Sequence, residues 1–229
     1  MKQRTDIQHV LPAAIERTSM SIITRELQER GIVIPDENAA VVRRVIHTTA
    51  DFDYAENLRF TEDAVSRAVA KLTAGGAVII TDTNMALSGV SKPSLKKLGA
   101  EAFCFMADPE IEKQAKELGT TRAVASMAYG AAKYPEAIFA VGNAPTALLK
   151  LEELIEEGLR PALIVGVPVG FVNVVESKER IFAVCEKYGI PAIVAFGRKG
   201  GSNVAAAIAN ALLYTAADAL DPGKRGWQG

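Results

Sequence analysis

His47 is the residue of this chain best suited to proton chemistry. It lies in an apolar, arginine-flanked stretch, residues 43–53. Histidine has the one side chain whose unperturbed pKa lies in the physiological range, so a placed imidazole can give or take a proton near pH 7. The second histidine, His9, lies among mixed residues near the N-terminus. The alternative is that His47 only caps a helix and bonds a nearby carboxylate such as Asp51.

A glycine-rich segment, residues 197–202, is the clearest candidate for binding an anion. It runs from an apolar strand into a helix, where glycine lets backbone N–H groups point at a negative group. The segment fits neither the phosphate loop Gly-x-x-x-x-Gly-Lys-Ser/Thr nor the dinucleotide fingerprint Gly-x-Gly-x-x-Gly. A carboxylate is therefore as good a ligand as a nucleotide phosphate, and a tight packing turn is the alternative to both.

Three further segments carry polar side chains, and two of them have two readings each. Asn143 opens a helix and either caps it or bonds a ligand, whereas Arg122 either grips a carboxylate with two hydrogen bonds or is a plain surface charge. We interpret residues 176–179 as the solvated start of a helix.

Cys104 and Cys185 lie in separate apolar runs and are read as core residues. No cysteine–histidine cluster has zinc spacing, so no metal site is predicted.

Composition excludes several classes of protein. The 229 residues carry 26 basic and 27 acidic side chains and a formal net charge of −1, with no dominant basic patch for a nucleic acid. Apolar runs are too short to cross a bilayer, and the polar N-terminus does not resemble a signal peptide. We therefore expect a cytoplasmic protein with no membrane partner.

Strands and helices alternate along most of the chain. Nearly continuous apolar runs predict five buried strands, at residues 77–82, 102–107, 137–143, 162–169 and 191–198. Helical patterns separate them, at residues 109–118, 121–133, 144–157, 176–188 and 204–219. This alternation predicts an α/β fold, a parallel sheet with helices on both faces. Ligands collect beyond the carboxyl ends of such strands, where small and polar residues gather at 81–85, 142–147, 166–172 and 197–203.

The two ends of the chain differ from this core. The first 75 residues read as helical throughout, at residues 11–30, 36–46 and 61–72, and residues 221–229 read as a loose tail. We expect a single domain over residues 1–229, with residues 76–220 as its sheet-containing core.

Six motifs taken together resemble one family. They are Val-Ile-His-Thr-Thr-Ala-Asp-Phe-Asp (45–53), Thr-Asp-Thr-Asn-Met (81–85), Thr-Arg (121–122), Gly-Asn-Ala-Pro-Thr-Ala (142–147), Pro-Val-Gly-Phe-Val with Glu-Ser-Lys-Glu (168–172, 176–179) and Gly-Arg-Lys-Gly-Gly-Ser (197–202). In this order, over about residues 19–213, they closely resemble the precorrin-8X methylmutases, or precorrin isomerases, of the corrin pathway to vitamin B12.

The resemblance implies an activity, a fold and an assembly. A methyl group would migrate from C-11 to C-12 of a tetrapyrrole, precorrin-8X or cobalt-precorrin-8, without a cofactor, and the residue matching His47 would be the proton donor. The string around His47 looks more like the branch that acts on cobalt-containing precorrins. The fold implied is a three-layer α/β/α sandwich with a five-stranded parallel sheet. The assembly implied is a homodimer with its active sites near the subunit interface.

The resemblance also implies which residues hold the substrate. Ser19 or Ser21 would face the site, and Arg122 and the loops at the sheet rim would bind the macrocycle and its carboxylates. The predicted substrate-binding residues are Ser19, Asp82, Met85, Arg122, Asn143, Pro145, Thr146, Gly197, Gly200, Gly201 and Ser202. Two alternatives stay open: a corrinoid-binding or carrier protein without chemistry, and a nucleotide-binding protein suggested by the rim glycines alone.

Overall fold

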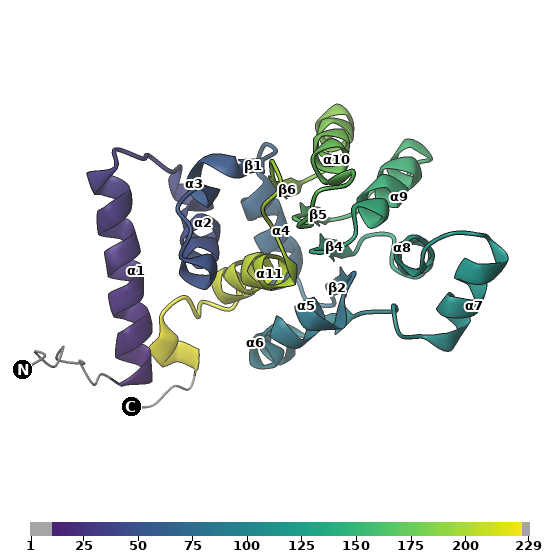
Figure 1. The fold of residues 1–229 in the computed structure, drawn as a ribbon. Coiled ribbons are helices and arrows are strands. Elements are labelled where there is room, and N and C mark those ends of the chain that lie inside the picture. Colours follow the sequence, from purple (N-terminus) through teal and green to yellow (C-terminus); the bar gives the residue numbers. More distant parts are fainter. Residues whose placement is uncertain (1–10, 226–229) are drawn as a thin grey trace, which may run out of the picture.

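A computed structural model describes residues 11–225 of the chain. One sheet of six strands lies between two layers of helices, as Figure 1 shows. The strands are β1 (Leu58–Phe60), β2 (Val78–Thr81), β3 (Glu101–Phe103), β4 (Ile138–Val141), β5 (Leu163–Gly166) and β6 (Ala192–Ala195). The helices are α1 (Pro12–Glu29), α2 (Asp36–Thr49), α3 (Tyr54–Asn57), α4 (Ala64–Thr73), α5 (Asn84–Gly89), α6 (Lys92–Leu98), α7 (Pro109–Glu117), α8 (Arg122–Lys133), α9 (Pro145–Glu156), α10 (Val174–Tyr188), α11 (Ser202–Ala216) and the 3-10 turn η1 (Pro222–Arg225).

The five strands expected from the sequence form the parallel part of the sheet. The strand order is β1-β6-β5-β4-β2-β3, and β6, β5, β4, β2 and β3 run parallel. Strands β4, β5 and β6 are buried along their whole length, which explains their unbroken apolar sequence. The predicted α/β class and the two helical layers are confirmed.

The prediction that the first 75 residues are all helical is wrong at one place. Residues 58–60 form β1, which pairs antiparallel with β6 and closes that edge of the sheet. Its three residues are too few to show an alternating pattern in the sequence. The predicted strand at 102–107 is also shorter, because only Glu101–Phe103 pair with β2.

The core has two large apolar clusters, one on each face of the sheet, and a small third one between α7 and α8. Helices α2, α4, α5 and α11 cover one face, where α11 is buried along most of its length. Helices α8, α9 and α10 cover the other face. Helix α1 lies outermost, beyond α2, with the C-terminal turn beside it (Figure 1).

The predicted loose tail is wrong for the part that the structure describes. Residues 222–225 form a 3-10 turn, and Asp221 and Arg225 bond side chains of α1. We call residues 221–225 the C-terminal turn. Residues 226–229 and His9 lie outside the described residues. Among residues 11–225, no helix is both long and apolar enough to cross a membrane.

Candidate functional site

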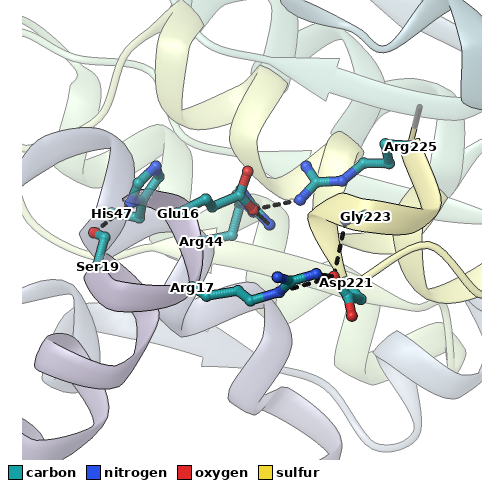
Figure 2. A network of polar contacts seen from close by, with 8 residues as sticks. All are labelled: Glu16, Arg17, Ser19, Arg44, His47, Asp221, Gly223 and Arg225. Carbon is teal, nitrogen blue, oxygen red and sulfur yellow. Dashed lines mark hydrogen bonds and ion pairs between the residues drawn. The ribbon is translucent and has the colours of Figure 1, made fainter. Parts of the chain in front are cut away.

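His47 is held in place by a hydroxyl from another helix. It occupies the last turn of α2, and its Nδ1 lies 2.7 Å from Oγ of Ser19 on α1, as Figure 2 shows. The ring is half-buried. The suggested contact between His47 and Asp51 is not formed, because Asp51 accepts a hydrogen bond from Nζ of Lys199 at 2.6 Å instead. One ring nitrogen is thus engaged, and Nε2 is the other nitrogen available for proton chemistry.

A broad groove of about 740 Å³ opens beside His47, between α1 and the end of α2. Six of its lining residues are apolar (four isoleucines, Ala50 and Phe52), and the guanidinium of Arg30 stacks on Phe52, at 4.0 Å from the ring centroid. The lining residues are Ile15, Thr18, Ser19, Ile22, Ile23, Glu26, Arg30, Ile46, His47, Ala50 and Phe52. Such a groove suits a large, mainly apolar ligand with a few polar groups.

A buried ionic network lies next to the histidine. Oε1 of Glu16 accepts hydrogen bonds from Arg44 at 2.7 Å and from Arg225 at 2.5 Å (Figure 2). Burial raises the pKa of Glu16, but the two guanidinium groups outweigh it and hold the pKa below its ordinary value. Burial lowers the pKa of His47, and the positive charges of Arg44 and Arg225 lower it further, against the opposing charge of Glu16.

Asp82 does not face solvent; it lies beneath the rim of the sheet and holds a rim loop in place. It is fully buried, and its two carboxylate oxygens accept the backbone N–H groups of Gly142, Asn143 and Ala144, each at 2.8 Å. Burial raises the pKa of this carboxyl, and the three N–H groups oppose the rise. Asp82 was predicted to contact substrate; the structure instead uses both oxygens to hold the 142–144 loop.

Two rim glycines are required by close backbone packing. A Cβ on Gly200 would lie 2.2 Å from the carbonyl oxygen of Val167, and one on Gly142 would lie 2.8 Å from Cα of Ser202. Gly201 and Ser202 are buried, and Oγ of Ser202 lies 2.7 Å from Oγ1 of Thr83. The alternative reading of the glycine-rich segment, a turn that permits packing, therefore holds for Gly200.

Other predicted residues do line the open rim. Met85, Arg122, Asn143 and Gly197 are exposed at the carboxyl ends of their strands or at the start of α8. Pro145 and Thr146 are partly exposed in the first turn of α9, where Oγ1 of Thr146 lies 3.3 Å from Oγ1 of Thr121. The structure thus brings these residues to one edge, as the strand pattern predicted for all of them except Arg122. The groove beside His47 does not include them.

The sequence reading missed a buried lysine that connects the rim to the histidine segment. Lys178 is fully buried, and its Nζ donates to the carbonyl oxygens of Gly197 at 2.9 Å and Lys199 at 2.8 Å. Lys199 in turn bonds Asp51 and Asp53, in the turn that follows His47. The interpretation of residues 176–179 as a solvated helix start is wrong for Ser177 and Lys178, which are buried. The one signal in the sequence is their position in the helical repeat of α10, which places both on its buried face.

Metal ligands do not cluster in the part of the chain that the structure describes. No group of three or more histidine, cysteine, aspartate or glutamate side chains within residues 11–225 could hold a metal ion. Cys185 is buried and Cys104 partly so, both as free thiols, as expected for core residues. Burial raises the pKa of Cys185 to about 12, so this thiol is unreactive at neutral pH.

The chain matches a family of known proteins over most of its length. The family model of the precorrin-8X methylmutases matches residues 14–215, from the α1 segment that carries Ser19 to the end of α11. This chain belongs to the precorrin-8X methylmutase family. The resemblance inferred from the six motifs is therefore confirmed.

Individual members of the family match most of the chain. The cobalt-precorrin-8 methylmutase of Salmonella typhimurium is 43% identical, over 89% of this chain and 95% of the relative. The precorrin-8X methylmutase of Pseudomonas aeruginosa is 38% identical, over 87% and 93%. A crystal structure of the precorrin-8X methylmutase from Thermus thermophilus superposes with a TM-score of 0.79 at 41% identity, covering 90% of this chain and 98% of that one.

Proposed function

We propose that the protein is an isomerase of vitamin B12 biosynthesis that moves a methyl group from C-11 to C-12 of precorrin-8, with His47 as the proton donor. The observation that carries this proposal is the contact of Ser19 with His47 at the edge of an apolar groove. Membership of the methylmutase family supports the reaction, and the geometry around His47 supports its role as the proton donor.

His47 acts through its free nitrogen. Because Nδ1 is held by Ser19, Nε2 is the atom that donates a proton to the bound macrocycle. A protonated ring system is poorer in electrons, which lowers the barrier for the methyl group to leave C-11 and bond to C-12. General acid help of this kind contributes ~10²- to 10⁴-fold. The product has the composition of the substrate, so His47 recovers its proton when the product forms.

The groove and the rim contact different parts of the substrate. The apolar lining formed by Ile15, Ile22 and Phe52 contacts the macrocycle, while Arg30 and the rim residue Arg122 pair with its carboxylate arms. Confinement between these groups keeps the migrating methyl close to the ring. We take the cobalt-containing precorrin as substrate, since relatives named for it reach 43–44% identity. The cobalt belongs to the substrate.

The assembly that suits this site is a homodimer. Leu11, Ile15 and Ile22 of the α1 segment are exposed apolar side chains, and the last two line the open groove. A second subunit over α1 would cover these side chains and supply the missing wall for a macrocycle. Light scattering should give the mass of a dimer, and a monomer with full activity at the assay concentration would contradict the shared site.

Product identification tests the function. The purified protein should convert cobalt-precorrin-8 anaerobically to cobyrinate, and more slowly convert metal-free precorrin-8 to hydrogenobyrinate. His47→Ala should abolish turnover while it keeps the helical content and the affinity for product. A wild-type protein that binds the precorrin and leaves its spectrum unchanged would be a carrier. Wild-type turnover by His47→Ala would remove the histidine from the mechanism.

A further inference from the structure

The C-terminal turn meets α1 on the side that carries Ser19. Arg225 donates to Oε1 of Glu16, and Asp221 accepts from Nε and Nη2 of Arg17 at 3.1 and 2.7 Å (Figure 2). Glu16 precedes Ser19 by three residues, so one turn of α1 separates the ionic contact from the hydroxyl that bonds His47. A shift of this part of α1 relative to α2 would therefore move Oγ of Ser19 away from Nδ1 of His47.

The two ionic contacts between the C-terminal turn and α1 differ in how far they are buried. This difference shows which of them matters for the position of α1. The Arg17–Asp221 pair is about half exposed on both sides, so it contributes little. The side chains of Glu16, Arg44 and Arg225 are 10–12% exposed, so each guanidinium depends on the one carboxylate. Arg44 and Arg225 also lie over the ring of Tyr214 on α11, at 5.1 and 4.3 Å from its centroid. Glu16 thus joins α1 to both α2 and the C-terminal turn.

We propose that Arg225, acting through Glu16, is a positioning residue that fixes α1 against α2 and holds Ser19 on His47. The inference rests on the proposed role of His47 as proton donor. It assigns a part in positioning the proton donor to the C-terminal turn, none of whose residues lines the groove. Arg44 is the partner on α2, and Arg225 completes the network from the other end of the chain.

The charges around His47 make the coupling measurable. On α1 these are Glu16 and, in the groove, Glu26, which pairs with Arg30. Arg44 lies on the same helix as His47, and Arg225 comes from the C-terminal turn. Because the positive charge of Arg225 lowers the pKa of His47 and Glu16 raises it, loss of Arg225 must raise that pKa, and loss of the Glu16 charge must lower it.

The test is a proton NMR titration of the imidazole together with steady-state kinetics. A His9→Gln background leaves His47 as the one histidine of the chain, so its C–H signals are identified without further assignment. In this background Arg225→Ala should raise the titration midpoint of His47 and lower kcat by about ten- to a hundredfold, the effect of a small misplacement of a reacting group. Arg225→Lys should restore both values in part, because a cation returns opposite Glu16.

Lys224→Ala is the matched control. Lys224 lies in the same turn but pairs with Asp218, outside α1, and both side chains are exposed. Its substitution should leave kcat and the midpoint unchanged. If Arg225→Ala behaves like Lys224→Ala, the proposal is wrong. A fall in kcat without a change in the His47 midpoint would equally overturn it, because the turn would then act elsewhere.

A second variant keeps the test valid if Arg225→Ala unfolds. Glu16→Gln retains an oxygen that accepts from both guanidinium groups and removes only the charge. It should lower the titration midpoint of His47, and an unchanged midpoint would contradict the coupling. The titration needs no substrate, so it can succeed even if His47→Ala proves active. In that event the proton-donor role fails while the link from Arg225 to the histidine stands.

Discussion

Oγ of Ser19 lies 2.7 Å from Nδ1 of His47, and the two residues come from different helices. The contact fixes the orientation of the ring, because a hydrogen bond to one nitrogen determines where the other points. Of the two nearby serines, Ser19 is therefore the one that contacts the histidine. Ser21 lies on an exposed face of α1, where its hydroxyl donates to the carbonyl oxygen of Arg17.

Ser19→Ala should lower kcat by about tenfold, which corresponds to ~1.4 kcal/mol of transition-state stabilisation. The imidazole would keep its place in α2 but lose the bond that orients it. Ser21→Ala is the control, two residues away on the same helix, and should retain wild-type kcat. Steady-state turnover of both variants decides the matter; equal rates would show that the hydroxyl has no role in orienting the ring.

The pH dependence should differ between the free enzyme and the complex. Burial and Arg44 lower the pKa of His47, so the free enzyme holds the required proton only below the ordinary value of about 6.5. Since a general acid works in its protonated form, kcat/KM should fall as pH rises through this lowered pKa. Carboxylates of the bound substrate favour the imidazolium, so kcat should fall at a higher pH. If kcat and kcat/KM fell over the same pH range, the result would contradict this account.

Arg122→Ala should weaken substrate binding more than it slows the chemical step. The side chain is exposed at the first residue of α8, on the rim. A hydrogen bond between charged groups contributes roughly 1.5–3 kcal/mol, so Kd should rise about ten- to a hundredfold. Lys71→Ala is the control, since Lys71 is a cation beside Gly76 and Ala137, at the opposite edge of the sheet. Titration with the corrinoid product measures both, and equal affinities would exclude Arg122 from binding.

Asp82→Asn should destabilise the fold by about 3 kcal/mol. An amide nitrogen in place of one oxygen would face backbone N–H groups of the 142–144 loop and leave them without an acceptor. Asp108→Asn is the matched control, because Asp108 is an exposed helix cap that bonds the N–H of Glu110, and asparagine caps equally well. Urea unfolding of both variants gives the comparison. A similar small loss in each would show that the loop does not depend on Asp82.

Much of this structure follows from patterns that are local in the sequence. Unbroken apolar runs located the parallel strands, because strands covered on both faces need no polar alternation. Because ligand-binding loops follow the carboxyl ends of parallel strands, the strand pattern also placed Asn143 and Gly197 at one edge. Arg122 was assigned to the site by the resemblance alone. His47 stood out by its chemistry alone.

The missed features all depend on residues far apart in the chain. Glu16 and Arg225 are separated by 209 positions, and no spacing rule connects them. Lys178 looked like a surface residue because a lysine beside two glutamates is usually solvated. Its burial is explained by the carbonyl oxygens of Gly197 and Lys199, which accept hydrogen bonds from Nζ. The resemblance assigned Asp82 to the ligand, but its partners are backbone N–H groups, which side-chain identity does not reveal.

The pairing of β1 with β6 has a consequence for the kinetics of folding. Leu58 pairs with Ala195, and the apolar face of α2, which includes Val42 and Val45, packs on α11. The segment that carries His47 is made early by the ribosome, but its partners are made last. Contacts this distant form slowly, because a long loop must close first. Until then the emerging chain exposes an apolar helix, so α2 is where chaperone binding or aggregation during synthesis should concentrate.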